Sequence, residues 1–411
     1  MRTQQFIELF PILQGTSVNG KPLVYLDNAA TSQRPQAVVD RMNEVNLHAN
    51  ANIHRAVHTL SSLATEAYEA SRDAAVRFLN AESRQEIVFT QGTTSAINLV
   101  AYSFGQAFVH KGDRIIVGEA EHHSNMVPWQ LLAQRTGAEV VYLHMGDDGL
   151  YDLSELDSLL TPSTKIVALA QASNVLGIVN PIKEMAYVCH AHNVPILVDG
   201  AQGVVHCKVD VQEMDCDFYA FSSHKMYGPT GVGVLYGKKK WLEQMPPFLS
   251  GGEMVGTVSL EGTSFAPLPQ KFEAGTQNFA NVAALATALE LQSRILNDSE
   301  LNAEFSKTVK WLCNALTSID GLTLYGAPGD VPMEFKLPVF SFTVDGVHHE
   351  DLAVLLDKMG VAVRSGQMCA EPLMNHFGVT GMVRASLLPY NTMQEAEYFT
   401  VALKKAIKML K

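Results

Sequence analysis

The stretch VPILVDGAQ (residues 194–202), followed by DFYAFSSHKMYGPTGVGVLYG (217–237), decides the fold of this 411-residue chain. The apolar run Pro195–Val198 is closed by Asp199 and a glycine, a pattern that indicates a buried parallel strand. Such strands present their carboxyl ends to a ligand crevice. We therefore expect Asp199 and Gln202 to face a binding site.

A second apolar run, Phe218–Phe221, ends in the same way and leads to Ser222, His224 and Lys225. An acid at one strand end and a lysine at another suit a pyridine cofactor that carries an aldehyde. The carboxylate keeps the ring nitrogen protonated, and the lysine amine binds the aldehyde covalently. Taken singly, such an aspartate is usually a helix cap and such a lysine is usually solvated. Their combination, with a serine, a histidine and a glycine-rich turn beside the lysine, favours the cofactor site.

The motifs DGAQ (199–202) and FSSHKMYGPTG (221–231) resemble the fold-type I pyridoxal-phosphate enzymes, specifically the cysteine desulfurases of the class V aminotransferase family. This resemblance implies an α/β fold, with a large domain built on a mostly parallel seven-stranded sheet and a smaller α+β domain at the C-terminus. Strand and helix patterns also alternate along the chain, which is typical of a parallel sheet with helical crossovers. We expect an N-terminal lead-in over residues 1–20 that packs on the small domain, a large cofactor-binding domain over 21–280, and a small domain over 281–411 that carries the catalytic cysteine.

Composition excludes several classes of partner. With 30 Lys and Arg against 42 Asp and Glu, the formal net charge is −12, which argues against binding to nucleic acid or to an anionic membrane. No apolar run reaches membrane-spanning length, and the start of the chain lacks a basic region followed by a long apolar core, so we expect a cytoplasmic protein. The five cysteines are scattered and form no CxxC motif, which predicts neither a disulfide framework nor a metal site.

A second motif predicts a phosphate site. The sequence QGTTSAIN (91–98) follows a predicted strand, Ile87–Thr90, and opens a helical pattern. Backbone N–H groups and the positive end of the helix would face a phosphate, and Thr93 and Thr94 would add hydroxyl donors. Alone this signal is weak, because Thr is also a common N-cap residue. Together with the lysine motif, it predicts the binding site for the cofactor phosphate.

The family resemblance implies further roles elsewhere in the chain. His122, in EHHSN (121–125), would stack on the cofactor ring, where a histidine can also move protons near neutral pH. Its neighbour His123 is expected to be structural. Ala29, in the segment YLDNAAT, and Asn174, in the segment ASNVLG, would lie on the substrate side of the site.

The same resemblance implies a homodimer with shared sites. Thr276 follows a glycine-rich and proline-rich segment, and in this family a residue at that position reaches the cofactor phosphate of the partner subunit. His54 and Arg55 correspond to a histidine and an arginine that lie near the neighbouring subunit's site.

The C-terminal region carries the motifs that specify the reaction. The sequence RSGQMCAEP (364–372) resembles the R-(T/S/A)-G-x-x-C-A-x-P motif of the group II, or SufS/CsdA-like, cysteine desulfurases, and RAS followed by YNT (384–392) matches their downstream motif. Arg384 suits the α-carboxylate of a substrate because its planar fork pairs bidentately, and Arg364 is a second candidate. Cys369, on a short glycine loop, suits a nucleophile that meets the substrate sulfur. The chain departs from the family at Gln367-Met368, where many members carry two histidines.

This resemblance implies a pyridoxal-phosphate-dependent cysteine desulfurase. Such an enzyme converts L-cysteine to L-alanine, holds the sulfur as a persulfide on Cys369, and passes it to an acceptor of the SufE or SufU type for iron–sulfur cluster assembly. A selenocysteine lyase, which acts on L-selenocysteine, or a cysteine sulfinate desulfinase would use the same residues. An aminotransferase is disfavoured because it needs no cysteine after Arg364. A catalytically inactive scaffold that only docks sulfur carriers is disfavoured by the intact Lys225, Asp199 and Arg384.

Overall fold

The large sheet forms the base of the molecule. The computed structural model describes residues 1–326 and 336–411, and within them a seven-stranded sheet has the order β4-β10-β9-β8-β7-β5-β6. Only β10 runs antiparallel to its neighbours, so the expected mostly parallel sheet is confirmed. The strands are β4 (Ile87–Thr90), β5 (Arg114–Gly118), β6 (Glu139–Leu143), β7 (Thr164–Ala170), β8 (Ile196–Asp199), β9 (Phe218–Ser222) and β10 (Gly233–Gly237).

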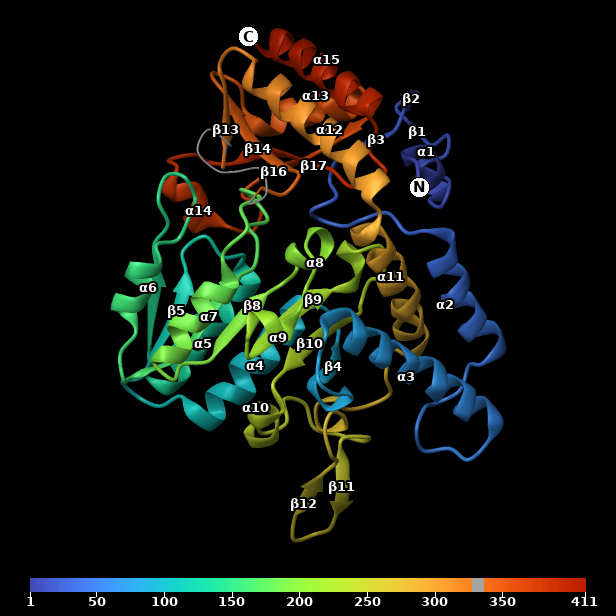
Figure 1. Cartoon of the computed structure of the whole chain (residues 1–411), viewed down its shortest axis with the longest axis vertical. Coiled ribbons are helices and arrows are strands. Elements are labelled where there is room, and N and C mark those ends of the chain that lie inside the picture. Colours follow the sequence, from blue (N-terminus) through green and yellow to red (C-terminus); the bar gives the residue numbers. More distant parts are fainter. Residues whose placement is uncertain (327–335) are drawn as a thin grey trace.

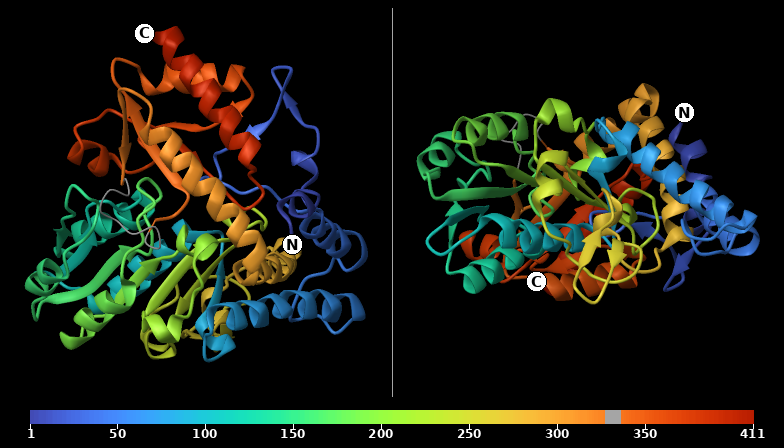
Figure 2. Two further views of the ribbon diagram at one scale, coloured as in Figure 1. Left: turned by 45° about the horizontal axis from the view of Figure 1, so that its top comes forward. Right: turned by 90° about the horizontal axis from the view of Figure 1, so that it is seen from below.

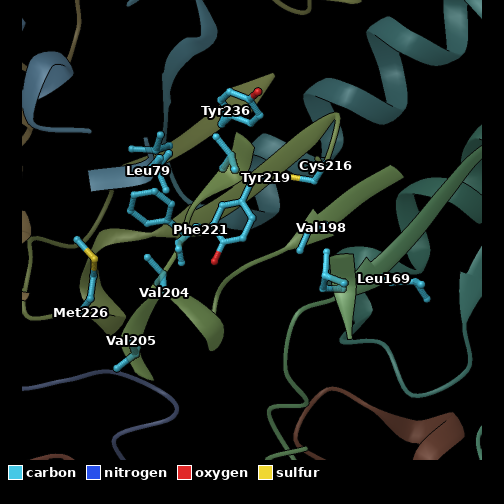
Figure 3. Packing of buried hydrophobic residues seen from close by; sticks show 14 of the residues in the cluster. Leu79, Leu169, Val198, Val204, Val205, Cys216, Tyr219, Phe221, Met226 and Tyr236 are labelled. Atoms are coloured by element: carbon cyan, nitrogen blue, oxygen red, sulfur yellow. The ribbon is translucent and has the colours of Figure 1, made fainter. Parts of the chain in front are cut away.

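Helices cover both faces of this sheet, which explains why its strands are continuous apolar runs (Figure 1). Along β8, Ile196 and Val198 belong to the apolar cluster on one face, and Leu197 belongs to the cluster on the other. Figure 3 shows the first face, where Val198 lies near Tyr219 and Phe221 of the next strand. The helices of the large domain are α2 (Gln36–His48), α3 (Thr59–Leu79), α4 (Thr93–Phe108), α5 (Val127–Thr136), α6 (Leu153–Leu159), α7 (Ile182–Ala191), α8 (Gly203–His206), α9 (Val211–Met214) and α10 (Lys239–Gln244).

A second, smaller sheet stands above the carboxyl ends of the large one (Figure 1). It is antiparallel and has the order β13-β14-β17-β16. Its separate apolar core contains Phe340 and Phe342 from the sheet and Phe399 and Leu403 from the terminal helix. The elements here are α11 (Phe279–Asn297), α12 (Ser299–Thr317), β13 (Leu322–Tyr325), β14 (Val339–Val344), α13 (His349–Lys358), β16 (Arg364–Gly366), α14 (Glu371–His376), β17 (Met382–Ser386) and α15 (Met393–Leu410).

The sequence pattern predicts one strand from Val361 to Arg364, but the structure divides this segment. Val361–Ala362 (β15) pairs in parallel with Val24–Tyr25 (β3), whereas Arg364 begins β16 and pairs with β17. The N-terminal segment therefore joins the small domain as an added strand before it enters the large domain (Figure 2). Two short strands, β1 (Ser17–Val18) and β2 (Lys21–Pro22), precede it.

The first residues pack where the two domains meet. Phe6, in α1 (Thr3–Ile7), and Phe10 are fully buried against Tyr227 of the large domain and Tyr390 of the small domain. The N-terminal amine also pairs with Asp298, which caps α12. These contacts involve both domains, and the boundaries at residues 20 and 280 stay predictions.

One hairpin projects from the body of the large domain (Figure 1). It consists of β11 (Val255–Val258) and β12 (Thr263–Phe265), in the segment where the sequence predicts an extended hairpin or loop.

Across the described residues, no helix combines the length and the apolar character needed to cross a membrane.

Candidate active site

A cavity of about 310 Å³ lies at the carboxyl ends of the large sheet, between the two domains. The site residues predicted from the sequence line it, except Thr276, His54 and Arg55, which are predicted to lie at the site of a partner subunit. The large domain contributes residues that follow β4, β5, β7, β8 and β9, while the N-terminal segment and the small domain supply the rest. The lining residues include Ala29, Thr93, Thr94, His122, Ser124, Asn174, Asp199, Gln202, Ser222, His224, Lys225, Arg364, Met368, Cys369 and Arg384. The chemical roles assigned to them stay predictions.

One end of the cavity is built for an anion. Helix α4 begins at Thr93, and its N-cap residue, Gly92, has no side chain that could cap it. The Ser222 hydroxyl accepts a hydrogen bond from the Thr93 backbone N–H at 2.8 Å and contacts the Thr93 hydroxyl at 2.8 Å. The Thr94 hydroxyl lies 2.7 Å from that of Ser124. Hydroxyl groups and a helix N-terminus thus converge at this end of the cavity, an arrangement suited to binding a phosphate.

The acid predicted at the centre of the site is buried, and the lysine is half-buried in the wall of the cavity. Burial raises the pKa of Asp199, and the positive charge of Lys225 opposes that rise. Burial lowers the pKa of Lys225 to about 8, against the opposing effect of Asp199. The Asp199 carboxylate accepts a hydrogen bond from the Ala201 N–H at 2.9 Å, which holds it at the end of β8. A lysine with this pKa is partly neutral near pH 7, so its amine can act as a nucleophile and as a base.

Two histidines line the cavity in the neutral form. Burial and the nearby Lys225 lower the pKa of His122 to about 4, and the same two causes lower that of His224 to about 4. The His122 Nδ1 accepts a hydrogen bond from the Ser124 N–H at 3.1 Å, so its ring proton lies on Nε2. A neutral imidazole of this kind is suited to stacking on an aromatic ring. Gln202 is fixed by a 2.7 Å hydrogen bond to the Ala29 carbonyl.

Cys369 is the exposed cysteine, whereas burial raises the pKa of Cys189, Cys207, Cys216 and Cys313. It sits in an unusual turn, because Met368 and Cys369 both have positive φ angles, of 54° and 57°. Left-handed backbone at two successive non-glycine residues is strained and has to be held by its surroundings. Asn174 donates to the Met368 carbonyl at 2.9 Å, and the backbone N–H of His123 donates to the Cys369 carbonyl at 2.8 Å.

The two arginines predicted to bind substrate share one carboxylate. Arg384 donates to the Asn174 carbonyl at 2.9 Å and to Asp27 at 3.2 Å. Arg364 donates to the same Asp27 through Nε and Nη2, at 3.2 and 2.9 Å. The sequence did not indicate that Asp27 and Ser124 belong to the site, or that His123 contacts the loop of Cys369. The segment YLDNAAT placed Asp27 near the site, but nothing in it indicated that Asp27 pairs with Arg364 and Arg384.

Thr276 lies outside the cavity and is exposed, in the turn that precedes α11. Arg55 is paired with Glu253 at 3.0 Å, and His54 lies 3.2 Å from Glu69. The single chain therefore does not bring these three residues into its own site. Their expected contact with a partner subunit stays a prediction.

The donor set fits pyridoxal phosphate. Asp199 would supply an anion for a protonated ring nitrogen, and Lys225 would supply an amine for the aldehyde. Thr93, Ser222 and the N-terminus of α4 supply donors for the phosphate. Among the described residues, no group of acidic, histidine and cysteine side chains is arranged to hold a metal ion.

The sequence is similar to a known enzyme family along almost its whole length. The model of the class-V aminotransferase family matches residues 24–399. The chain is 44% identical to a probable cysteine desulfurase of Halalkalibacterium halodurans, over 98% of both chains. It is 45% identical to a cysteine desulfurase of Escherichia coli O127:H6, over 98% of this chain and 97% of that one.

Two solved structures extend this similarity to the fold. The cysteine desulfurase CsdA of Escherichia coli superposes with a TM-score of 0.90 and 40% identity, with 100% of both chains covered. The apo cysteine desulfurase of Thermococcus onnurineus superposes with a TM-score of 0.92 and 36% identity, with 100% of this chain and 99% of that one covered.

Proposed function

The chain belongs to the class-V aminotransferase family, and on that premise we propose that it is a pyridoxal-phosphate-dependent cysteine desulfurase. It converts L-cysteine to L-alanine and transfers the sulfur to its own Cys369. The observation that carries this proposal is the convergence on one cavity of an exposed cysteine, a half-buried lysine and a buried aspartate. An aminotransferase would need the pair but not the cysteine.

The residues that line the cavity have different roles in the proposed reaction. When bound, the cofactor supplies an electron sink that stabilises the negative charge left on the substrate α-carbon. Asp199 would provide a negative charge for the ring nitrogen of the cofactor. The amine of Lys225 takes the α-proton, which its pKa of about 8 permits near neutral pH. Arg384 and Asn174 would orient the substrate, and His122 would offer a neutral imidazole for stacking on the cofactor ring.

Cys369 receives the sulfur. Its thiolate attacks the substrate sulfur, a sulfur–sulfur bond forms, and the bond between sulfur and the β-carbon breaks. The electron pair of that bond stays with the carbon fragment, which gains protons and leaves as alanine, while Cys369 keeps a persulfide. The carbonyls of Met368 and Cys369 are held by Asn174 and His123, so the sulfur stays at the mouth of the cavity.

The product persulfide requires an acceptor. Because the turn that carries Cys369 is short and tied down, an acceptor protein has to approach it, and we propose one of the SufE or SufU type. The sulfur would then supply iron–sulfur cluster assembly in the cytoplasm. We further propose a homodimer in which Thr276 completes the phosphate site of the partner subunit.

The substitution Cys369→Ser tests this function. The variant should bind the cofactor and L-cysteine normally, because Lys225, Asp199 and Arg384 are unchanged, but it should form no persulfide and release little alanine. Mass spectrometry after one turnover, without reductant, measures the persulfide directly. Cys207→Ser is the matched control and should behave as the wild type does. Extra sulfur on any cysteine other than Cys369 would disprove the assignment.

A further inference from the structure

Two arginines stand directly opposite each other at the substrate side of the cavity. In the antiparallel pair formed by β16 and β17, Arg364 is the cross-strand partner of Arg384. Like charges in directly opposed positions destabilise a sheet. The penalty is large here because Arg384 is only 2% exposed, and burial lowers the pKa of its guanidinium. The pair therefore needs a compensating anion.

Asp27 is that anion, and the backbone puts it there. The N–H of Leu26 donates to the Ala362 carbonyl at 2.8 Å, and the N–H of Ser386 donates to the Leu26 carbonyl at 2.7 Å. The N-terminal segment thus lies between Ala362 of β15 and Ser386 at the end of β17, and Asp27 itself forms a bridge with Ser386. Its carboxylate, 16% exposed, accepts from Arg364 at 2.9 Å and from Arg384 at 3.2 Å.

The two arginines carry more positive charge than Asp27 offsets. Arg384 uses Nη1 for the Asn174 carbonyl and Nη2 for Asp27, but its Nε is buried and finds no hydrogen-bond partner within the described residues. Two guanidinium groups and one carboxylate leave a net charge of +1 beside the cavity. A buried positive charge that is not compensated is costly, and the carboxylate of a ligand in the cavity would compensate it.

We propose that Asp27 is a positioning residue that orders both arginines for the carboxylate of the substrate amino acid. Asp27 aligns Arg384 through Nη2 and restrains Arg364, whose side chain is 47% exposed. Without the charge of Asp27, repulsion from Arg384 would push Arg364 into solvent and leave the buried guanidinium poorly oriented. The inference rests on the proposed function only in that the ligand is an α-amino acid.

The test compares two ligands that differ only in the carboxylate, L-alanine and ethylamine, bound to the holoenzyme and followed by the absorbance of the cofactor. In Asp27→Asn the dissociation constant of L-alanine should rise roughly tenfold or more, because a charge-assisted contact is lost. That of ethylamine should change by less than about twofold. A parallel change for both ligands, or none for L-alanine, would overturn the proposal.

Turnover supplies a second readout. With L-cysteine, Asp27→Asn should raise KM by roughly tenfold and leave kcat nearly unchanged, because the lost contact acts equally on bound substrate and transition state. A fall in kcat at unchanged KM would contradict this. Asp320→Asn, an exposed aspartate outside the cavity, is the matched control. If Asp27→Asn does not fold, Asp27→Ser is measured by the same ratio of L-alanine to ethylamine affinity, with the same outcomes.

These measurements separate this proposal from the proposed function. Binding of L-alanine does not involve Cys369 or sulfur transfer. A protein that shows the predicted loss of L-alanine affinity but never forms a persulfide would disprove the desulfurase proposal and support the role of Asp27. If instead the wild type forms the persulfide and Asp27→Asn binds L-alanine as tightly as the wild type does, the desulfurase proposal is supported and the role of Asp27 is disproved.

Discussion

At the scale of single residues, burial sets the protonation states that the site requires. An ordinary lysine is almost entirely protonated near neutral pH, and an ordinary histidine is partly protonated. Desolvation disfavours the charged forms of both, so Lys225 becomes partly neutral and His122 becomes fully neutral. The carboxylate of Asp199 limits the effect on the lysine, because it stabilises the ammonium form.

The lowered pKa of Lys225 predicts how the apoprotein takes up its cofactor. Only the neutral amine reacts with the aldehyde, so the initial rate of uptake should rise about tenfold per pH unit below the pKa and level off above about pH 8. An ordinary lysine, with its pKa near 10.4, would give a rate that is still rising at pH 10. The appearance of the cofactor's absorbance band after rapid mixing measures the profile, and Lys225→Ala should give no covalent product on borohydride treatment. A midpoint above pH 10 would contradict this prediction.

At the scale of elements, the phosphate end of the cavity depends on the close approach of two backbones. β10 lies beside β4, and a Cβ on Gly233 would overlap the backbone of Gly92, where α4 begins. A Cβ on Gly92 would itself lie 3.1 Å from the Ser222 hydroxyl, which bonds Thr93. Position 233 needs a glycine because any side chain there would collide with the backbone of Gly92 at the N-terminus of α4.

Gly233→Ala should therefore weaken both the fold and the binding of the cofactor. The added methyl group has to displace the start of α4, which should cost about 1–3 kcal/mol of stability and reduce cofactor affinity by roughly tenfold. Thermal unfolding of the apoprotein and titration with pyridoxal phosphate measure the two effects. Gly251→Ala is the control, since a Cβ there meets nothing within 4 Å. Wild-type stability and affinity in Gly233→Ala would rule out the close approach.

At the scale of the whole molecule, the site exists only because the two domains and the N-terminal segment close around one cavity. The large sheet contributes Lys225 and Asp199, and the small domain contributes Cys369 and Arg384. Large apolar side chains are exposed on the projecting hairpin and around the segment that joins α2 to α3, and exposed apolar patches mark protein–protein interaction sites. They include Leu47 (74%) in α2, Val57 (103%) before α3, and Val258 (67%) and Leu260 (104%) in the hairpin.

We predict that these side chains are covered in a homodimer. Introducing charge with Val258→Asp and Leu260→Asp should shift the protein toward monomers and lower its affinity for the cofactor, because Thr276 could no longer reach the partner's site. Sedimentation velocity at several protein concentrations measures the shift. Val354→Asp, on α13 at the opposite end of the molecule from the hairpin (Figure 1), is the control. A fully active wild-type monomer would disprove the shared site.

The sequence by itself determined the layout of the large domain and most of the residues around the cavity. Buried parallel strands read as short apolar runs, and the polar residue that ends each run necessarily lies at the same edge of the sheet, so Asp199 and Lys225 could be assigned together. The resemblance of local motifs to a family added His122, Asn174 and Cys369, which also line the cavity. Local pattern was sufficient for these residues because each follows directly from where its own strand or loop ends.

Only the tertiary structure decided how distant segments meet. It inserted the N-terminal strand beside β15, split the predicted strand at Val361–Arg364, and brought Asp27 between two arginines more than 330 positions away. It also left Thr276 outside the cavity of its own chain. The physical reason is that pairing register and ionic contacts between remote segments depend on which backbones pack together. A periodic pattern of apolar residues records which side of an element is buried, but not which partner buries it.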